Sequence, residues 1–394
     1  MSIFLYLLFI YLSIGVGYFL FFAIAGKLSS SAVNVEQFQF KKIAVVVPAY
    51  KEDQVILSTV QKALEHDYPS EKFEVFVMAD QLSIVTLHAL RQLPLKVNEV
   101  MYATSTKAKS LHSFFESQQE SSFDIVMVLD ADNIMEDGCL SRVNDAFFKG
   151  AQVVQCHRTA KNTNSALAIL DAISEEIRIN IFFAGHHALG LSAELIGSGM
   201  AFKYDLLESI LKNKKIQEST GEDKEIFLQL VKQEIGVVYL KDARVLDEKV
   251  SNLTVFKKQR TRWIESQLNI VKRFFDTEFD SVRTKGSFWY RLFQNLLLPR
   301  SFYLLLLPLF SMLTYLLEFR SINLSPSSTY WFIVTLLYCL SLLISIPPSY
   351  LNSKTVLALA KLPVVLFTMV SASLYARLSN KIFVHTKKEY ENVD

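Results

Sequence analysis

The chain has 394 residues, of which 51% are hydrophobic and 20% are charged, and its formal net charge is +2. This composition is too apolar for a purely soluble enzyme and too charged for a simple bundle of membrane helices. The length predicts two or three units, and the near-neutral charge gives no support for nucleic-acid binding. Cys139, Cys156 and Cys339 lack metal-site spacing and indicate a reducing compartment without a disulfide framework.

The chain opens with an apolar segment, residues 3–25, that carries no charge and is long enough to cross a bilayer. A cleaved signal peptide is the alternative, but the segment lacks a basic start and its apolar part is too long. We therefore expect a retained transmembrane anchor over residues 1–26. Lysines follow it at positions 27, 41 and 42, so the next domain, after a polar linker at residues 27–40, is predicted to be cytoplasmic.

Apolar runs then alternate with segments of helical spacing. The expected strands are residues 43–47, 73–79, 99–103, 125–129, 151–157, 236–240 and 243–248, and the expected helices include 55–66, 85–93, 107–117, 167–183 and 222–233. Strands that alternate with helices predict an α/β fold with a parallel, doubly wound sheet. A Gly-x-Gly-x-x-Gly fingerprint and a P-loop lysine motif are both missing from the sequence, so neither a dinucleotide fold nor an ATPase is supported.

Two carboxylates, Asp130 and Asp132, come directly after the buried run at residues 125–129. At this spacing they project from the same side of an extended chain and repel each other unless a cation lies beside them. Ligands of open α/β sheets bind at the carboxyl ends of strands, where Asp80 also lies. Mg²⁺ or Mn²⁺ bridging to a diphosphate would suit these acids, whereas the alternative is a strand followed by an ordinary polar turn.

Three later features allow both a structural and a functional interpretation. Gly197 and Gly199 either let the backbone approach a ligand closely or form a bulged strand. Glu222 and Asp223 open a helix, where acids favour the positive end, and Asp223 is also a candidate catalytic aspartate. The adjacent histidines 186 and 187 give only weak support for a metal site.

Residues 255–275 form an expected amphipathic, basic helix. It either lies on anionic lipid or directs Arg262 and Trp263 into the cleft, with the arginine toward phosphate, and its two faces allow both. Three apolar stretches follow at 296–317, 330–348 and 355–376, and then a basic tail. Four crossings would place that tail outside, against its charge, so either the charge tendency fails or one stretch is interfacial or re-entrant.

Seven short stretches, in this order, resemble membrane-bound members of glycosyltransferase family 2, the group that contains cellulose, chitin and hyaluronan synthases. They are residues 45–52, 78–80, 107–111, 129–133 (Leu-Asp-Ala-Asp-Asn), 197–202, the acid pair 222–223 and 259–263 (Gln-Arg-Thr-Arg-Trp). The resemblance implies a type A-like nucleotide-sugar fold inserted between membrane helices. It implies a catalytic domain at 41–250, interfacial helices at 251–295, membrane helices at 296–376 and a polar tail at 377–394.

The resemblance also assigns roles to single residues. Asp223, beside Glu222, would be the general base, and Asp132 would bind Mg²⁺ or Mn²⁺. The residues implied to bind the nucleotide sugar are Pro48, Ala49, Tyr50, Glu52, Asp80, Lys107, Asp130 and Asp132, and those implied on the acceptor and diphosphate side are Gly199, Gln259, Arg262 and Trp263. The chain departs from the family pattern at Tyr50-Lys51, where His-Asn is commoner, at Gln81, where Asn or Gly is usual, and at His112, where Asn is usual.

The resemblance implies an inverting, metal-dependent transfer of sugar from a UDP-sugar to a growing polysaccharide or oligosaccharide, at the cytoplasmic face of the plasma membrane. Transfer of a single sugar to a membrane lipid is the main alternative. The small number of spans favours that alternative, or an oligomer or an export partner. A scaffold or translocation subunit with a vestigial cleft is a non-enzymatic alternative, and a transporter is disfavoured because the apolar stretches contain almost no charge.

Overall fold

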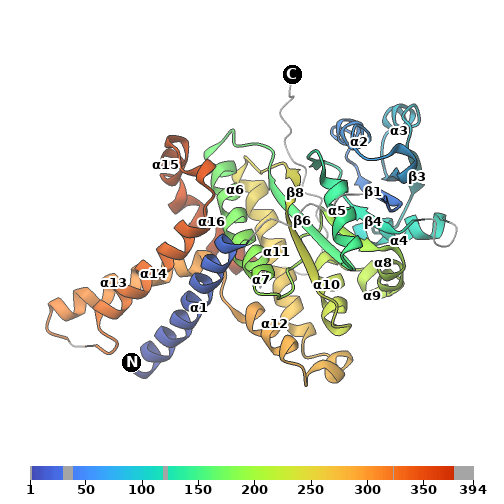
Figure 1. Ribbon diagram of the computed structural model, residues 1–394. Coiled ribbons are helices and arrows are strands. Elements are labelled where there is room, and N and C mark those ends of the chain that lie inside the picture. The colour runs from blue at the N-terminus through green and yellow to red at the C-terminus, as the bar shows by residue number, and fades with distance from the viewer. Residues whose placement is uncertain (1, 30–38, 119–122, 323, 377–394) are drawn as a thin grey trace. The chain divides into compact units, whose positions relative to one another are not determined.

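The computed structural model describes residues 2–29, 39–118, 123–322 and 324–376, which fold into two compact units (Figure 1). The described parts of the first, the helical unit, fall within Met1–Ser29, Asn164–Gly190 and Val250–Lys381. Those of the second, the sheet unit, fall within Ser30–Thr163 and Leu191–Lys249. The chain therefore passes from the sheet unit into the helical unit and back before it finishes the sheet.

The sheet unit contains one eight-stranded sheet with the strand order β3-β2-β1-β4-β7-β6-β8-β5. Its strands are β1 (Ile43–Tyr50), β2 (Phe73–Asp80), β3 (Lys96–Val100), β4 (Ile125–Val128), β5 (Ile134–Met135), β6 (Val153–Ala160), β7 (Met200–Lys203) and β8 (Val237–Asp247). Strands β1 to β4 are mutually parallel where they pair, whereas β7 runs antiparallel to both β4 and β6. The α/β class is as predicted, but the sheet is mixed, with β7 antiparallel to its neighbours where a parallel sheet was expected, because an apolar run does not encode strand direction.

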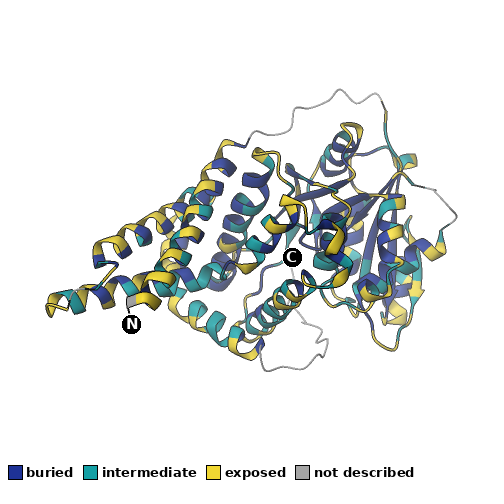
Figure 2. Cartoon of the chain, turned by 90° about the horizontal axis from the view of Figure 1, so that it is seen from below, coloured by how far each residue is buried: buried dark blue, intermediate teal, exposed yellow. Residues whose placement is uncertain are grey.

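Helices cover the sheet and complete its core. They are α2 (Ile56–Leu64), α3 (Ile84–Leu90), α4 (Lys107–Ser117), α5 (Cys139–Phe148), α8 (Tyr204–Leu211), α9 (Lys214–Gln217), α10 (Glu222–Lys232) and the short η1 (Ser70–Lys72). The apolar runs of β1 and β4 are inaccessible to solvent, and they pack with α2 and α5 into one cluster (Figure 2). Each such buried aliphatic side chain stabilises the fold by about 1.5–3 kcal/mol, so the middle of the sheet is a rigid support for the loops at its edge.

The helical unit is built from α1 (Ser2–Leu28), α6 (Ala166–Ile179), the π-helical turn η2 (Asn180–Ala184), α7 (Gly185–Ala188), α11 (Leu253–Arg273), η3 (Thr277–Val282), α12 (Gly286–Leu296), α13 (Arg300–Phe319), α14 (Ser328–Ser345), η4 (Pro348–Tyr350), α15 (Ser353–Leu359) and α16 (Leu362–Ala376). In α1, a Cβ on Gly26 would lie 2.2 Å from the carbonyl oxygen of Asn180. Glycine is therefore needed for α1 to approach η2 this closely.

Among the described residues, three helices are long and apolar enough to cross a membrane: Ile3–Leu28, Arg300–Phe319 and Ser328–Ser345. A fourth candidate exists only if α15 and α16, which meet at an angle of 53°, count as one broken span. The break falls at Ala360 and Lys361, just before Pro363, whose ring and missing N–H disfavour a continuous helix there. Large apolar side chains of α13 and α14, such as Leu309 and Leu336, are exposed, as expected of surfaces that face lipid.

Candidate active site

The carboxyl ends of β1 and β2 bring the first predicted site residues to one edge of the sheet. Ala49 pairs with Ala79 and Tyr50 with Asp80, and Lys51 N donates to Asp80 O at 3.0 Å. Pro48 lies one register position earlier on β1, and the carbonyl of Glu52 accepts hydrogen bonds at the start of α2. The structure therefore places the residues predicted from the first two strands side by side.

The residues that follow these two strands have left-handed backbones, with φ of 58° at Lys51 and 56° at Gln81. This conformation costs roughly 1–2 kcal/mol for a residue with a Cβ, and asparagine and glycine adopt it most easily. Both positions are departures from the family pattern, in which Asn or Gly is usual. The same turns are therefore formed here by less suitable residues, which is the kind of strain found at functional sites.

Asp80 is fully buried, and neither of its carboxylate oxygens has a hydrogen-bond partner among the described residues. Burial raises the pKa of Asp80, while the Ser105 hydroxyl and the Lys51 ammonium oppose that rise. Ser105 is close enough to favour the ionised form without meeting the geometry of a hydrogen bond. A buried acceptor without donors is costly, so this carboxylate is suited to N–H or O–H groups of a ligand.

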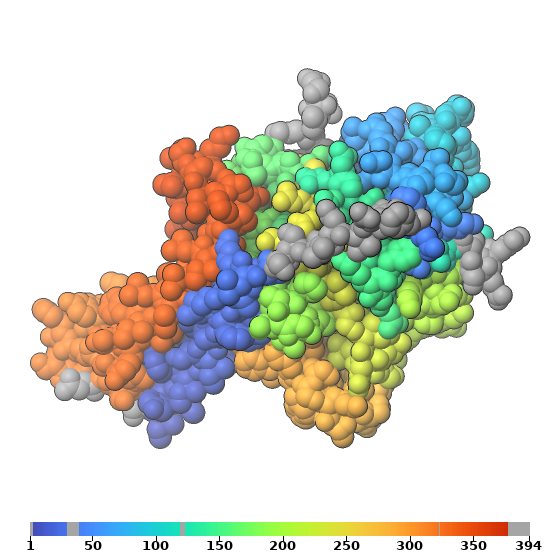
Figure 3. Space-filling model, in the orientation of Figure 1, coloured from blue at the N-terminus to red at the C-terminus, as the bar shows by residue number. Residues whose placement is uncertain are grey.

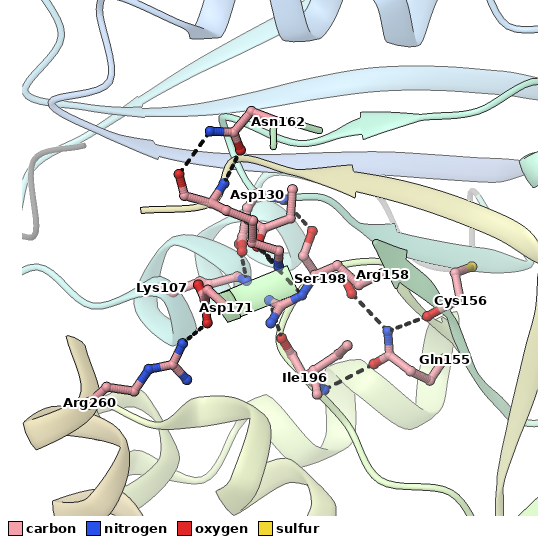
Figure 4. Close-up of polar contacts among 12 residues, drawn as sticks. Lys107, Asp130, Gln155, Cys156, Arg158, Asn162, Asp171, Ile196, Ser198 and Arg260 are labelled. Atoms are coloured by element: carbon pink, nitrogen blue, oxygen red, sulfur yellow. Dashed lines mark hydrogen bonds and ion pairs between the residues drawn. The ribbon is translucent and has the colours of Figure 1, made fainter. Parts of the chain in front are cut away.

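Lys107 lies at the centre of the acidic part of the site (Figure 4). It begins α4, which is capped by the Thr106 side chain. Its ammonium forms an ion pair with Asp130, donates to the carbonyl oxygen of Gly197 at 2.7 Å, and lies 3.7 Å from Glu222 Oε1. Burial lowers the pKa of Lys107, but the surrounding carboxylates outweigh burial, so the net shift is upward and the side chain stays charged.

The predicted acid pair lies in the first turn of α10, next to Lys107. Burial raises the pKa of Glu222, as do its neighbours Asp223 and Asp130, whereas Lys107 lowers it. The Cβ and Oδ2 atoms of Asp223 lie 3.9 Å from the position that a Cβ on Gly197 would occupy. The structure therefore brings Lys107, Asp130, Glu222, Asp223 and the glycine loop together, although they come from four distant parts of the sequence.

The loop at residues 195–199 has a left-handed backbone at both glycines, with φ of 85° at Gly197 and 68° at Gly199. A Cβ on Gly199 would lie 2.9 Å from a methyl carbon of Val245, so the loop needs glycine at this position. The hydroxyl of Ser198 accepts a hydrogen bond from Asp130 N at 3.0 Å. This hydrogen bond connects the glycine loop directly to the turn after β4, which carries Asp130 and Asp132.

Two buried side chains on β6 hold this loop and were missed in the sequence analysis. Gln155 donates to the Ser198 carbonyl at 2.8 Å and accepts from Ile196 N at 3.1 Å, and Arg158 donates to the Ile196 carbonyl at 3.1 Å (Figure 4). The signal available in the sequence was a polar residue inside an otherwise apolar strand. Buried polar groups are nearly always hydrogen-bonded, so Gln155 could have been assigned a supporting role.

Asp130 and Asp132 belong to a tight turn in which Asn133 N donates to the Asp130 carbonyl at 3.0 Å. In the described residues, no three His, Cys, Asp or Glu side chains gather closely enough to hold a metal ion by themselves. Mg²⁺ is commonly held by one or two carboxylates together with substrate phosphates. Two carboxylates at this turn therefore fit a metal that arrives with a diphosphate, and do not fit a closed protein site.

The predicted residues Gln259, Arg262 and Trp263 lie on α11, in the helical unit. Their neighbour Arg260 is buried and forms an ion pair with Asp171 of α6 (Figure 4). Its guanidinium also lies over the Trp263 ring, 4.0 Å from the ring centroid. That α11 completes the site of the sheet unit remains a prediction.

The histidines considered at residues 186 and 187 are also in the helical unit. His186 hydrogen-bonds through Nε2 with Tyr18 at 2.8 Å and with Tyr290 at 3.1 Å. These contacts explain the buried ring as part of the packing of the helices.

The sequence model of a family described as glycosyltransferase like family 2 matches residues 41–266, more than half of the chain. The chain belongs to glycosyltransferase family 2. The match runs from the start of β1 through most of α11 and contains all seven motifs of the predicted site. The part of the earlier resemblance that concerns the family itself is therefore confirmed.

Two curated relatives are similar to this family 2 chain. One, from Bacillus subtilis (strain 168) and named probable glycosyltransferase YdaM, is 22% identical over an alignment of 259 residues, and the match covers 63% of this chain and 60% of the relative. The other is a dolichyl N-acetyl-alpha-D-glucosaminyl phosphate 3-beta-D-2,3-diacetamido-2,3-dideoxy-beta-D-glucuronosyltransferase of Methanococcus voltae. It is 21% identical over an alignment of 210 residues, and the match covers 48% of this chain and 62% of the relative. The chain spans about three-fifths of the length of these relatives.

Among solved structures, the mannosyltransferase PcManGT of Pyrobaculum calidifontis, in complex with GDP-Man and Mn²⁺, superposes with a TM-score of 0.53. The sequences are 15% identical, and the alignment covers 93% of this chain and 97% of the other. This likeness concerns the fold, and it confirms the predicted α/β class of the type A glycosyltransferase kind.

Proposed function

We propose that the chain is a membrane-attached, inverting glycosyltransferase that moves a sugar from a UDP-sugar onto a saccharide at the cytoplasmic face of the plasma membrane. One observation carries the proposal. Lys107 holds Asp130, the Gly197 carbonyl and the Glu222–Asp223 pair together at the edge where β1, β2 and β4 end. This is a charged, convergent set of groups on a rigid sheet, as a transfer reaction requires.

On the donor side, the unsatisfied carboxylate of Asp80 would accept N–H or O–H groups of the nucleoside. Tyr50 ends the neighbouring strand, in register with Asp80. Asp130 and Asp132 would hold the nucleotide, Asp132 through Mg²⁺ or Mn²⁺, and the metal would neutralise charge on the leaving diphosphate. Arg262 is assigned to the same diphosphate through the family resemblance.

On the acceptor side, Asp223 would take the proton of the attacking hydroxyl. Lys107 and the raised pKa of Glu222 reduce the negative charge beside Asp223, which lets a carboxylate remain there without strong repulsion. Attack from the face opposite the diphosphate inverts the anomeric carbon. A β-linked product is therefore expected from an α-linked donor, and an α-linked product would contradict the mechanism.

Two acceptors compete. The Gln-x-x-Arg-Trp segment at 259–263 favours extension of a polysaccharide. The name of the M. voltae relative describes transfer to a sugar on a dolichyl phosphate, which favours a lipid-linked saccharide. The described part of the chain holds three candidate spans, or four with the bent pair, which is few for a self-contained polymer channel and also favours the lipid-linked acceptor.

The test is UDP release by purified protein in lipid vesicles with a panel of UDP-sugars, with Mg²⁺ or Mn²⁺ and with a chelator. We expect one donor to be consumed, activity to be lost with the chelator, and Asp223→Asn to be inactive. Asp205→Asn is the matched control, because Asp205 is an exposed acid in the first turn of α8 in the same unit. A ladder of products on a gel indicates polysaccharide, and a single glycolipid indicates the lipid-linked acceptor. If no donor releases UDP, the result would favour the non-enzymatic alternative, a scaffold or translocation subunit whose cleft is vestigial.

A further inference from the structure

The broken helix pair α15–α16 determines how often the chain crosses the membrane. Its sequence is apolar enough for a span, but a fourth crossing would place the basic tail, with Arg377, Lys381, Lys387 and Lys388, outside. The contacts made by α15 and α16 inside the helical unit decide between a crossing and an interfacial position.

Helix α14 runs parallel to α1, and its last turn lies at the same end. The ring of Phe9 packs 5.0 Å from that of Trp331, and Phe19 packs 6.0 Å from Tyr338. At the far end, the ammonium of Lys27 donates to the Ile346 carbonyl at 3.3 Å. The chain after α14 therefore emerges on the side where α1 ends and where the chain continues into the sheet unit. In Figures 1 and 3, α15 lies at this end of α14, opposite the turn between α13 and α14.

Helix α16 then packs along α11 instead of leaving it. Val365 and Met369 pack against a buried cluster that contains Phe256 of α11, and the Lys257 ammonium lies 4.0 Å from the centroid of the Tyr375 ring. Tyr375 lies one residue before the end of α16. If α16 crossed the bilayer, Tyr375 and therefore Lys257 would have to lie at the opposite face.

The length of the chain forbids that position for Lys257. Leu253, where α11 starts, lies four positions after Lys249, the last described residue of the sheet unit, and Lys257 lies four positions after Leu253. These segments reach at most about 14 Å extended and about 6 Å as helix, less than the roughly 30 Å of a hydrocarbon core. A lysine inside that core would also be costly.

Helix α15 is held on the same side by α6. Ala358 is buried in a cluster with Leu170 and Ile173 of α6, and α6 begins at Ala166, shortly after the chain leaves the sheet unit at Thr163. The opposite side of the pair is exposed and apolar: Val356 is 67% exposed, Leu357 75% and Phe367 76%. Exposed lysines lie in the first turn of α15, at Lys354, and just after the helix, at Lys361, a pattern typical of helices that lie among anionic headgroups.

We propose that α15–α16 lies in the headgroup–acyl boundary of the leaflet that faces the sheet unit, with lipid covering its exposed apolar face. The chain then crosses the bilayer three times, through α1, α13 and α14, and the basic tail lies on the side of the sheet unit. The inference rests on the proposed function only for its premise that the helical unit is embedded in a bilayer. Its tests measure no enzymatic activity, so a failure of this topology can be distinguished from a failure of the proposed function.

The first test labels single cysteines in full-length protein that carries Cys339→Ser, with a membrane-impermeant maleimide applied to intact cells and to inverted membrane vesicles. The remaining native cysteines, Cys139 and Cys156, are buried. Glu71→Cys marks the sheet unit, and Arg320→Cys marks the turn between α13 and α14. We expect Asn392→Cys to be labelled only in inverted vesicles, like Glu71→Cys. Labelling of Asn392→Cys in intact cells, with or without labelling in inverted vesicles, would overturn the proposal.

The second test measures depth. A nitroxide on Val356→Cys is compared with one on Leu336→Cys, which is exposed in the middle of α14. We expect the α15 label to be more accessible to a water-soluble nickel complex and less accessible to oxygen than the α14 label. Equal depth for the two labels would show that α15 enters the hydrocarbon core and would overturn the interfacial position.

Discussion

Replacing Lys107 by methionine removes the ammonium that lies between Asp130 and Glu222, while nearly keeping the volume of the side chain. The carboxylates would then repel one another in a setting where the lysine side chain is only 18% exposed and that of Glu222 only 12%. We expect Lys107→Met to destabilise the sheet unit and to abolish transfer, because the acid pair and the Gly197 carbonyl lose the group that holds them together.

The size of the effect follows from the burial of the partners. Removing one partner of a buried ion pair costs about 3–5 kcal/mol, and Asp130 is 34% exposed, so the low end applies. A loss of about 3 kcal/mol lowers the midpoint of thermal unfolding by roughly 6–12 °C for a domain of this size. The same change at Lys62, whose ion pair with Glu65 is on the surface, is the matched control and should leave the midpoint unchanged.

The assay is thermal unfolding of the purified protein for Lys107→Met, Glu222→Gln and the double variant. Since the lysine and Glu222 interact, neutralising Glu222 should return part of the stability lost with the lysine, so the two effects should not add. Strictly additive losses, or an unchanged midpoint for Lys107→Met, would refute the view that this lysine holds the carboxylates together.

Three further predictions concern single features of the two units. Lys51→Gly and Gln81→Gly should each raise the free energy of unfolding by about 1 kcal/mol, because glycine adopts the left-handed backbone of these turns at little cost. Chemical unfolding at a fixed lipid-to-detergent ratio measures this change. A lower stability of both variants would show that these two positions are not strained. The pKa of Glu222 is raised in the folded state, so its contribution to stability is lost as the pH rises through that pKa. Glu222→Gln should remove this decline from a series of melts between about pH 4 and 9. Parallel curves of melting temperature against pH for the two proteins would contradict the raised pKa. Asp171→Asn removes the carboxylate that faces the buried Arg260 and should lower the free energy of unfolding by about 3–5 kcal/mol. Tryptophan fluorescence should also shift, because the contact of Arg260 with the Trp263 indole changes. The double variant Asp171→Leu, Arg260→Met should restore the stability but not the fluorescence.

The sequence predicted the elements at the edge of the sheet well, because their signals are local. The apolar run at residues 125–129 that ends in Asp130, and the run that ends in Asp80, are visible as abrupt changes from apolar to acidic residues. The order of seven short motifs then indicated the family, although each motif is weak alone. What these patterns could not give is direction, since β7 has the same alternation whether it runs parallel or antiparallel to β4.

The division into two units was also beyond the sequence patterns. Residues 164–190 look like any helix between two strands, yet they belong to the helical unit, because their apolar partners lie on α1 and in the later helices. In α11 the motif drew attention to Arg262, whereas the buried ion pair with Asp171 is made by Arg260. The two arginines differ only in which face of the helix they occupy, and a partner 89 residues away in the sequence decides that.

Residues 164–190 belong to the helical unit and interrupt the sheet unit in the sequence, and this order affects how the sheet forms during synthesis. Before it, the chain has made only β1 to β6, and the strands that join β4 to β6 and β6 to β5, namely β7 and β8, are not yet synthesised. A nascent chain at this stage exposes the open edges of β4 and β6, which are templates for aggregation. Residues 164–190 are therefore synthesised before β7 and β8, so the sheet can close only after this part of the helical unit has been made.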